Sequence, residues 1–501
     1  MIKLTAAGGA GLFVNQVSAN AFLGESAVLP KPLELSNDEW FAHRAWSVSA
    51  NKVLDKTTAV TSLARNIYRP QSAEAIAAIM KSLPSTTSIA CVCGGHESSN
   101  VALVASGEAA IIDLILFKSI EFHRTSDDSL VTVGSGVVFR ELVEAVKLQG
   151  GALPVGTGPG VGVAGYVTNG GLSSYFSRRL GLLGQRVVKM TVVTAAGDIL
   201  TLTPKDELFT AMLGAGSALA IVVDLTIRMA DASVVKSAEQ RVFGFETREQ
   251  AVSYSREAMR FMREHVIPNE SVSLEIVVTG TKAIVATTVF YDTFNGDPSA
   301  FVKPLEDLAV SMKLPALAQD HWASWYEAAA ALWPVIAEQK GNPLATLYHC
   351  MGTEGSPGDD AIDFVSDTIV GGAPLDEAEL SIIEIRSLGG EVQKHSRVPS
   401  GNCNYGFFVD IVTLYDASSK PLAERREIVD LTNQIVNKAR KVQGLGVDFS
   451  GTHSQPDDVD LTTVASEIFG SEIMATSVQK LKKTMDPNNR FRFHPFAKFI
   501  A

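Results

Sequence analysis

The pattern of apolar and polar residues predicts many short strands and few helices in the first half of the chain. Pro70 is expected to end an extended piece, and Ser72 to cap an amphipathic helix that continues through Met80. A second helix is predicted from residue 139 until the glycines at 150 and 151 stop it, and a hairpin is predicted over 187–203. Further strands are predicted for residues 87–93, 108–117, 129–137 and 218–230. This texture indicates an α+β fold rather than regular βαβ repetition.

The pattern changes at about residue 232. Residues 246–266 and 421–442 are predicted to be helices, and the second has basic residues near its end, which suits the helix dipole. Alternating runs predict strands over residues 271–280, 283–292, 379–390 and 405–416. We therefore predict a second domain built on an antiparallel sheet with helices on one face. A last helix is expected to end at Asp486-Pro487.

Composition bounds the class of protein. At 501 residues the chain is too long for one core, and its net charge of -12 argues against a nucleic-acid partner. It contains no run of about 18 apolar residues, so no membrane-spanning helix is predicted. Cys91 and Cys93 are expected to be buried strand thiols, and no second ligand pair predicts a metal site.

The N-terminal segment leaves the compartment open. Residues 1–55 are expected to be irregular, and residues 1–21 are mildly apolar and close on an A-x-A-like sequence. A signal or leader peptide of a secreted protein and the start of a cytoplasmic protein are therefore both alternatives. The oligomeric state is not predicted.

Two glycine-rich stretches carry the candidate chemistry. They are "CVCGGHESSN" at residues 91–100 and the region 156–171, which includes "GVGVAG". The latter matches the G-x-G-x-x-G fingerprint, but no strand precedes it and no Asp or Glu follows before Asp198. A Rossmann site is therefore rejected. Glycine backbone can still approach phosphate oxygens closely, so the two loops suit an elongated diphosphate ligand.

An ordered set of motifs resembles a known family. The motifs are "IYRPQSAEAI", "CGGHESSN", "AAIIDLILFKSI", "VTVGSGVVFRELVEAV", "GPGVGVAGYVTNGGLSSYFSRRLGL", "VVTAAGDIL", "ELFTAMLGAGSALAIVVDLTIR" and "DPNNRF". Together they resemble the berberine-bridge-enzyme-like branch of the vanillyl-alcohol-oxidase / p-cresol methylhydroxylase flavoproteins. The resemblance implies a bipartite FAD-binding domain (PCMH-type) with an inserted antiparallel-sheet substrate domain. The implied limits are 1–55 (N-terminal segment), 56–232 (FAD domain), 233–450 (substrate domain) and 451–501 (the segment completing the FAD domain).

The resemblance also implies how FAD is held. His96 matches the histidine that bonds to the flavin 8α-methyl carbon, whereas Gly158 stands where many members carry a second, cysteine link. FAD is therefore expected to be covalent through His96 only. The implied cofactor-binding residues are Gly94, Gly95, His96, Glu97, Ser98, Pro159, Gly160, Val161, Gly162, Gly165, Tyr166, Gly170, Gly171, Ile221 and Val222.

Several positions depart from the family pattern. Val92 replaces an arginine, and Ala164 replaces a glycine of the second loop. Glu472-Ile473 stands where an Asn-Tyr pair is usual. Val161 matches the family's oxygen-gatekeeper position, where valine is associated with oxidases. Ala164 lies nearby, and its side chain is expected to obstruct oxygen if it enters the same space. These departures keep an inactive relative open as an alternative.

The resemblance implies an FAD-dependent oxidase. It would take a hydride from an alcohol, amine or specialised metabolite to flavin N5 and pass electrons to O2. Tyr405 is the preferred catalytic base, with Asp410, predicted on the opposite strand face, and Glu384, on the preceding strand, as further candidates. The alternatives are a dehydrogenase, a flavin-dependent cyclase without net redox, and a non-catalytic flavin-binding relative. Phe408 favours a less polar metabolite over a sugar.

Overall fold

The structure, a computed structural model, describes most of residues 31–500. The gaps are residues 35, 46–47, 50–63, 65, 98–100, 107, 174, 236, 271, 281–284, 294–298, 332, 334–343, 373–377, 379, 395–397 and 449–460. Ser98 and the first 30 residues, with the A-x-A-like sequence, lie outside the described residues.

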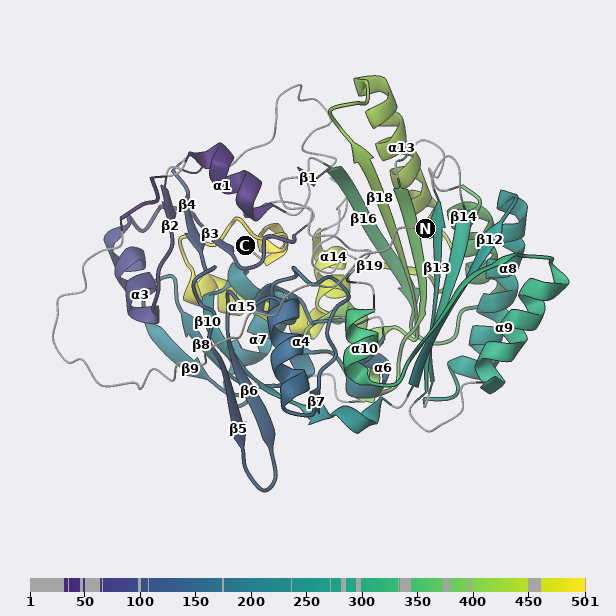
Figure 1. The fold of residues 1–501 in the computed structure, drawn as a ribbon. Helices are drawn as coiled ribbons and strands as arrows, with labels where there is room; N and C mark the ends of the chain where they lie inside the picture. Colours follow the sequence, from purple (N-terminus) through teal and green to yellow (C-terminus); the bar gives the residue numbers. More distant parts are fainter. Residues whose placement is uncertain are drawn as a thin grey trace, which may run out of the picture.

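Two small sheets form one side of the molecule (Figure 1), which we call the small-sheet domain. One is parallel, with β2 (Asn66–Tyr68), β4 (Ala110–Asp113) and β3 (Ile89–Val92) in that order. The other is antiparallel, in the order β5 (Ile120–Arg124), β6 (Ser129–Gly134), β10 (Ile221–Arg228), β8 (Val187–Val193) and β9 (Ile199–Leu202). The predicted β8–β9 hairpin is confirmed. A two-stranded ladder joins β7 (Gly151–Ala152) and β11 (Ala230–Asp231).

The helices of this domain begin where the sequence indicates, although α3 continues two residues beyond the predicted end at Met80. In α3 (Ala73–Ser82) the Ser72 hydroxyl accepts a hydrogen bond from the Ala75 amide, so the predicted cap is confirmed. In α4 (Phe139–Leu148) Leu142, Val143 and Val146 are buried, whereas Leu148 is exposed, and the helix ends before Gly150, whose φ is +64°. The short α5 (Val163–Val167) and α6 (Ser177–Leu180) follow the second glycine-rich stretch.

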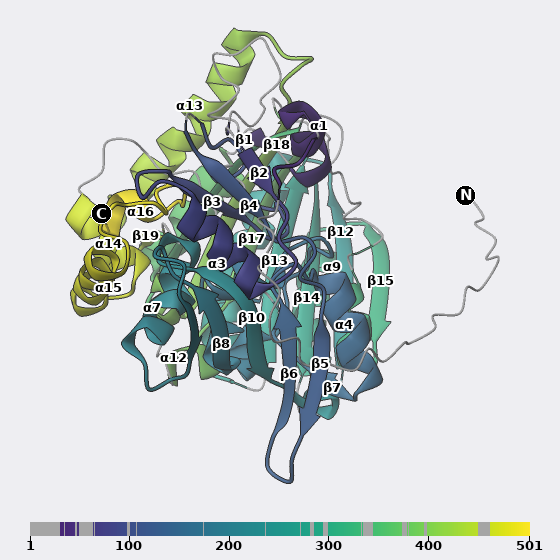
Figure 2. The ribbon, with the colours of Figure 1, turned by 90° about the vertical axis from the view of Figure 1, so that its left-hand side faces the viewer.

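The end of the chain packs on the small-sheet domain. Figure 2 shows α14 (Leu461–Ile468), α15 (Glu472–Met485) and α16 (Ala497–Ile500) beside α7 (Glu207–Ala215). The Lys482 ammonium is buried and donates to the Ala218 carbonyl and to Asp486, at 2.8 and 2.7 Å. A buried ammonium is costly unless fully paired, so these bonds fix α15 against the turn after α7.

A nine-stranded sheet forms the large-sheet domain. Its order is β1 (Val48–Ser49), β16 (Leu344–Thr353), β18 (Phe407–Asp416), β17 (Leu380–Ser387), β13 (Val272–Gly280), β14 (Val285–Thr293), β12 (Ser237–Phe245) and β15 (Ala316–Trp322), with β19 (Gly446–Asp448) also on β16. All pairings are antiparallel except β1–β16. The helices α8 (Arg248–Phe261), α9 (Ser299–Ser311) and α13 (Leu422–Ala439) cover the face turned away from the small-sheet domain (Figure 1).

The two faces of this sheet differ in chemistry because side chains alternate along each strand. The helix-covered face carries apolar residues such as Ile276, Ile385 and Val409, which are fully buried. The opposite face, which we call the polar face, carries Glu275, Glu384, Arg386, Phe408 and Asp410 in adjacent register positions. Charged residues at buried strand positions need partners, so this face requires a closer description.

Part of the N-terminal segment is ordered, so the expectation that residues 1–55 are irregular is wrong for α1 (Asn37–Arg44). Its Ser36–Glu39 capping box starts the helix, which buries Trp40 and Arg44. Asp113 at the end of β4 binds both: the Trp40 indole donates at 2.9 Å and the Arg44 guanidinium lies at 3.1 Å. Arg69 lies 2.9 Å from the same carboxylate. Because β1 then pairs with β16, the large sheet also extends beyond the predicted boundary at residue 55.

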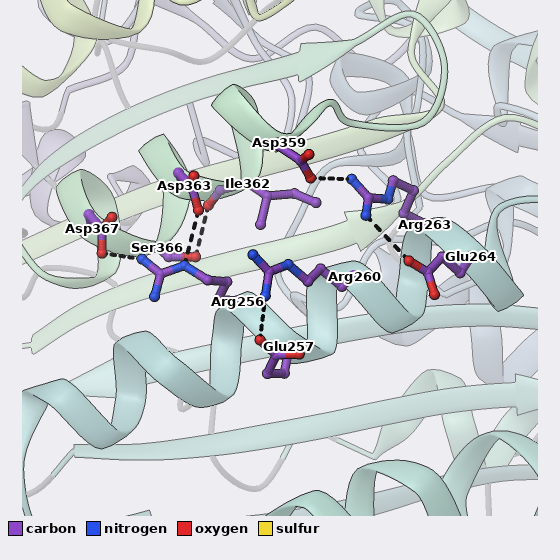
Figure 3. Close-up of polar contacts among 10 residues, drawn as sticks. All are labelled: Arg256, Glu257, Arg260, Arg263, Glu264, Asp359, Ile362, Asp363, Ser366 and Asp367. Carbon is purple, nitrogen blue, oxygen red and sulfur yellow. Dashed lines mark hydrogen bonds and ion pairs between the residues drawn. The ribbon is translucent and has the colours of Figure 1, made fainter.

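Ion pairs join the outer helices of the large-sheet domain. Arg256 and Arg263 of α8 and the π-helical turn after it reach across to acidic residues of α11 (Asp359–Asp363) and the following π-helical segment (Figure 3). Arg256 pairs with Asp363 and Asp367, and Arg263 with Asp359 at 2.7 Å. The carboxylates are more than half exposed, so each pair is expected to contribute little to stability.

Arg178 joins the two domains. It lies in α6 of the small-sheet domain, is 3% exposed, and donates hydrogen bonds to backbone carbonyls of the large-sheet domain. The acceptors are Val266 (3.0 Å), Ile267 (2.6 Å), Asn269 (3.2 Å), Val272 (2.8 Å) and Leu388. Burial lowers the pKa of Arg178 to about 10, so the guanidinium stays charged at neutral pH. The first two carbonyls close a π-helical turn, where the helix dipole favours a cation.

Replacing Arg178 should therefore weaken the domain interface. We expect Arg178→Met to lower the free energy of unfolding by roughly 3 kcal/mol, because buried carbonyls lose a charged donor. Denaturant unfolding measures the change. Arg260→Met, which removes an exposed pair with Glu257, is the matched control and should cost less than about 0.5 kcal/mol. Equal losses in both variants would show that Arg178 does not join the domains.

Candidate functional site

The two glycine-rich loops touch each other through their backbones. A Cβ at Gly94 would lie 2.3 Å from the Gly162 nitrogen, and a Cβ at Gly162 would lie 2.5 Å from the Gly94 nitrogen. Neither position tolerates a side chain. Gly95 has φ +75° and packs on the Arg44 carbonyl, so it also needs to be glycine. The sequence-predicted loops are thus brought together although about sixty residues separate them.

His96 lies against the second loop. A Cβ at Gly158 would stand 3.5 Å from the His96 Nε2 atom and 2.9 Å from a Val161 methyl group. The two positions at which the resemblance places flavin links are therefore neighbours in space. The imidazole is half-buried, and Glu97 follows it, also half-buried.

Space for a ligand opens beside the contact between the loops. A Cβ at Gly160 or Gly165 would meet no atom within 4 Å, unlike one at Gly94 or Gly162. Pro159 and Val161 are held by α4, since their carbonyls accept from the amides of Arg140 and Phe139 at 3.0 Å. Tyr166 follows, with its ring edge-on to Phe139 and a buried hydroxyl that has no hydrogen-bond partner among the described residues. Open glycine positions, a polar hydroxyl and an imidazole at one place fit a flavin cofactor.

The structure does not bring every predicted cofactor residue to this place. Gly170 and Gly171 adopt φ +93° and +80°, but Ser400 and Leu183 occupy the space beside them, so both glycines serve packing of the protein on itself. Ile221 and Val222 start β10 and are buried in the core, paired with Val193 and Val192.

The loop departures have local consequences. Val92, where an arginine was expected, is buried and its carbonyl accepts from Leu114 at 2.9 Å. A guanidinium nevertheless reaches this turn, because Arg44 of α1 donates to the Cys93 carbonyl. Cys91 and Cys93 are free thiols. Burial raises the pKa of Cys93 to about 11, so the thiol stays neutral and inert at neutral pH.

A buried ionic cluster lies on the polar face, which turns toward the segment after the second loop. Arg386 contacts Glu275 at 2.7 Å, and also Glu384 and Asp410, so one guanidinium faces three carboxylates. Glu275 and Asp410 are 2% and 0% exposed. Tyr166 and Tyr175 of the small-sheet domain lie close enough to Arg386 for its positive charge to offset part of the rise that burial causes in their pKa values. The cluster therefore lies on the side of the large sheet that faces the small-sheet domain.

In this cluster burial and the charge of Arg386 have opposite effects on the pKa values of the carboxyl groups. Burial raises the pKa of both Glu275 and Asp410 above their ordinary values, although the Arg386 charge partly offsets the effect. The Tyr348 hydroxyl lies within hydrogen-bond reach of Asp410, and burial raises the pKa of Tyr348 well above its ordinary value. Asp410 Oδ1 has no hydrogen-bond partner among the described residues. A carboxylate of this kind has an acceptor site available for a proton or a donor group.

Tyr405 lies on the same side of the sheet as Asp410, so the prediction of opposite faces is wrong. Tyr405 precedes β18, where the strict alternation of a strand does not apply. Its ring packs on Phe408, with 5.7 Å between centroids, and against Gly352 of the neighbouring strand. Gly352 and Phe408 are register partners on the polar face. Glu384, Arg386 and Asp410 are also on this face.

Tyr405 is one of the residues that line a cavity of about 930 Å³. Glycines and polar groups make up most of its wall, including Gly352, Gly446, Asn404, Glu354 and Glu472. It lies between the ends of β16 and β18 and the helices α14 and α15. Trp325 is 1% exposed and donates to the Leu153 carbonyl at 2.9 Å as part of the core.

Sequence reasoning missed Arg386, Glu275 and Tyr348. The run "ELSIIEIRSLGG" contained a signal, because its alternation places Glu384 and Arg386 on one face of a buried strand. The described residues contain no group of three or more His, Cys, Asp or Glu arranged to hold a metal ion. Within the same residues no helix has the length and apolarity to span a membrane.

The chain is similar to known proteins both in sequence and in fold. Residues 64–203 match the family described as FAD binding domain. (R)-6-hydroxynicotine oxidase from Paenarthrobacter nicotinovorans is 31% identical over 138 residues, which are 27% of this chain and 29% of that protein. The match thus spans less than a third of the curated relative.

Solved structures match over a greater length. Glucooligosaccharide oxidase from Acremonium strictum, with its 6-S-cysteinyl, 8α-N1-histidyl FAD, has a TM-score of 0.73 at 16% identity and covers 91% of this chain and 94% of its own. A variant of berberine bridge enzyme has a TM-score of 0.72 at 18% identity, covering 91% and 93%.

These matches define the class: the chain contains an FAD binding domain and has the fold of the PCMH-type FAD-binding oxidases. The resemblance to the berberine-bridge-enzyme-like flavoproteins is confirmed at the level of domain and fold, and so is the α+β class with its antiparallel sheet.

The glycine geometry predicts separable effects on fold and cofactor. Gly94→Ala should cost roughly 1–3 kcal/mol of stability, because its Cβ overlaps the Gly162 backbone. Gly165→Ala should leave apoprotein stability unchanged but lower flavin content, because its Cβ enters open space beside the loop. Thermal unfolding and flavin absorbance measure the two effects. Gly358→Ala, also open but remote from the loops, is the control for both. Loss of stability in Gly165→Ala with full flavin content would contradict this assignment.

Proposed function

We propose that this protein is an FAD-dependent oxidase. It would remove a hydride and a proton from a small molecule and deliver two electrons to O2, which gives hydrogen peroxide. The observation that carries the proposal is the buried carboxylate cluster opposite the glycine loops. A proton acceptor and a cofactor cradle on facing walls are what substrate oxidation at a flavin requires.

We infer that His96 bonds covalently to the flavin. Its imidazole lies beside Gly158, where no thiol is available for a second link, so a single attachment is expected. The glucooligosaccharide oxidase of similar fold, with its histidyl and cysteinyl FAD, supports the histidine link by analogy. When bound, FAD would accept the hydride and reduce O2.

Asp410 is the proposed base. Arg386 holds one of its oxygens and thereby orients the other, Oδ1, which is free to accept a proton. Phe408, two positions away on the same face, is also buried. The Arg386 charge offsets part of the rise that burial causes in the pKa of Asp410, and so favours the ionised form. Tyr405 lines the cavity and is not the proposed base.

Val161 favours the oxidase over the dehydrogenase alternative. Its side chain contacts the Gly158 position next to His96, where it borders the proposed flavin. Ala164, which was expected to obstruct oxygen if it intrudes, is 2% exposed and packs in the core.

The covalent link has a direct test. Acid-precipitated wild-type protein should stay yellow, whereas His96→Ala should release its flavin or purify without it. Absorbance of the pellet and the supernatant measures the difference. Cys93→Ala, which changes a neutral thiol three residues away, should stay yellow. Release of all flavin from the wild type would contradict the link but leave the oxidase proposal intact.

The role of Asp410 predicts a pH-dependent rate. The ionised form is the base, and burial raises its pKa above 3.8, so flavin reduction should slow as pH falls through the raised pKa. Asp410→Asn should reduce the rate constant about 10²–10⁴-fold at neutral pH and remove this limb of the profile. Stopped-flow bleaching of the flavin without oxygen measures it. Asp367→Asn, an exposed ion-pair partner of Arg256, is the control. An Asp410→Asn rate within twofold of wild type would eliminate Asp410 as base.

A further inference from the structure

Strand β15 is an edge strand of the large sheet. Among the described residues it pairs with β12 alone, and no described strand pairs with its other side. Every residue from Ala316 to His321 is exposed, so neither face of the strand is covered. Figure 2 shows β15 at the outer margin of the large sheet. An edge of this kind presents unpaired amide and carbonyl groups that another strand can bind.

Two other sheet edges are protected against such pairing. The opposite end of the large sheet is the two-residue strand β1. At one edge of the five-stranded sheet, β5 carries the exposed charges of Glu121 and Arg124. By contrast, β15 has seven residues and contains no Lys, Arg or Pro, which are residues that commonly block an edge. Its register shift against β12 lies between Ala318 and Ala316, so the ladder from Ala318 to Trp322 is regular.

The sequence of β15 favours one register for pairing with a second copy of itself. In an antiparallel pair related by a two-fold axis, opposite side chains lie on the same face, so one residue stands opposite itself. Gln319 is the middle residue of the strand, and a centre there aligns all seven residues. A centre at Asp320 would set two carboxylates opposite each other, which is destabilising. With Gln319 at the centre, Asp320 stands opposite Ala318, and the two Gln319 amides, each both donor and acceptor, face each other.

Exposed apolar side chains accompany this edge. Leu317 is 55% exposed, and its methyl group lies over β12, 3.3 Å from where a Cβ at Gly244 would stand. Val310, which is 74% exposed, lies in the last turn of α9, and α9 leads into β15. In the register centred on Gln319, Leu317 stands opposite His321 of the second copy. Its removal from water would add to the backbone hydrogen bonds of the new ladder.

From this edge we propose that two copies of the chain associate through β15 and join their large sheets into one continuous antiparallel sheet. The two-fold axis passes through the Gln319 pair and is perpendicular to the sheet, so the helix-covered faces of both copies lie on the same side. Each chain carries a net charge of -12, so association depends on this local match rather than on long-range attraction. One strand pair is a small interface, and we expect a Kd on the order of 10 µM.

Charge variants at Gln319 test both the dimer and its register. Gln319→Lys and Gln319→Glu each place two like charges at the two-fold axis, so either variant alone should dimerise about tenfold more weakly or worse. Mixed in equal amounts, the two variants should form a heterodimer, because an ammonium then faces a carboxylate. Sedimentation velocity of the holoprotein up to roughly 100 µM measures the association. Gln434→Lys, an exposed exchange on α13, is the matched control and should dimerise like the wild type.

Several results would overturn the proposal. A wild type that stays monomeric over this concentration range shows that β15 does not pair with a second copy. A dimer that neither Gln319 variant weakens is formed by another surface. A mixture of the two variants that remains monomeric excludes the register centred on Gln319. If the wild type is monomeric and Gln319→Lys lowers its melting temperature while Gln434→Lys does not, a segment of the same chain covers the edge instead. The oxidase proposal does not depend on any of these results.

Discussion

The arrangement of the site depends on one buried cation, Arg178. Its guanidinium is anchored in α6 of the small-sheet domain and bound by carbonyls at the start of β13 and just after β17. These are the strands that carry Glu275 and Arg386. Because a charged donor bound by five fixed carbonyls has little freedom to move, the ionic cluster and the glycine loops are held at one fixed relation.

The same electrostatic principle recurs at the functional face. Arg386 is buried among three carboxylates, and Lys482 and Arg44 are each buried beside an aspartate. Lys482 pairs with Asp486 near the end of the chain, and Arg44 of α1 shares Asp113 with Arg69. The Arg386 cluster differs because its excess charge is negative and Asp410 Oδ1 has no hydrogen-bond partner among the described residues. The proposed role of Asp410 as base rests on that open acceptor.

Local elements were largely predictable, and long-range partners were not. The Ser72 cap, the β8–β9 hairpin and the alternating strands follow from short-range periodicity, and the structure confirms them. The prediction that Tyr405 and Asp410 lie on opposite faces failed because the alternation was extended to Tyr405, two residues ahead of the start of β18 at Phe407. Helix α1 was missed because its signal is short, and its burial depends on Asp113, which lies far along the chain.

The sequence by itself determined which chemistry was available: a histidine beside two glycines, a second glycine loop, a missing second thiol, and acidic residues spaced to share strand faces. Backbone freedom at glycine and alternation along strands are local properties, so they can be read from the residues. Only the tertiary structure decided that Gly94 meets Gly162, that Arg386 gathers Glu275, Glu384 and Asp410, and that Arg178 joins the domains. These contacts depend on strand register and domain packing, whose energies sum over the whole chain and leave no local signature.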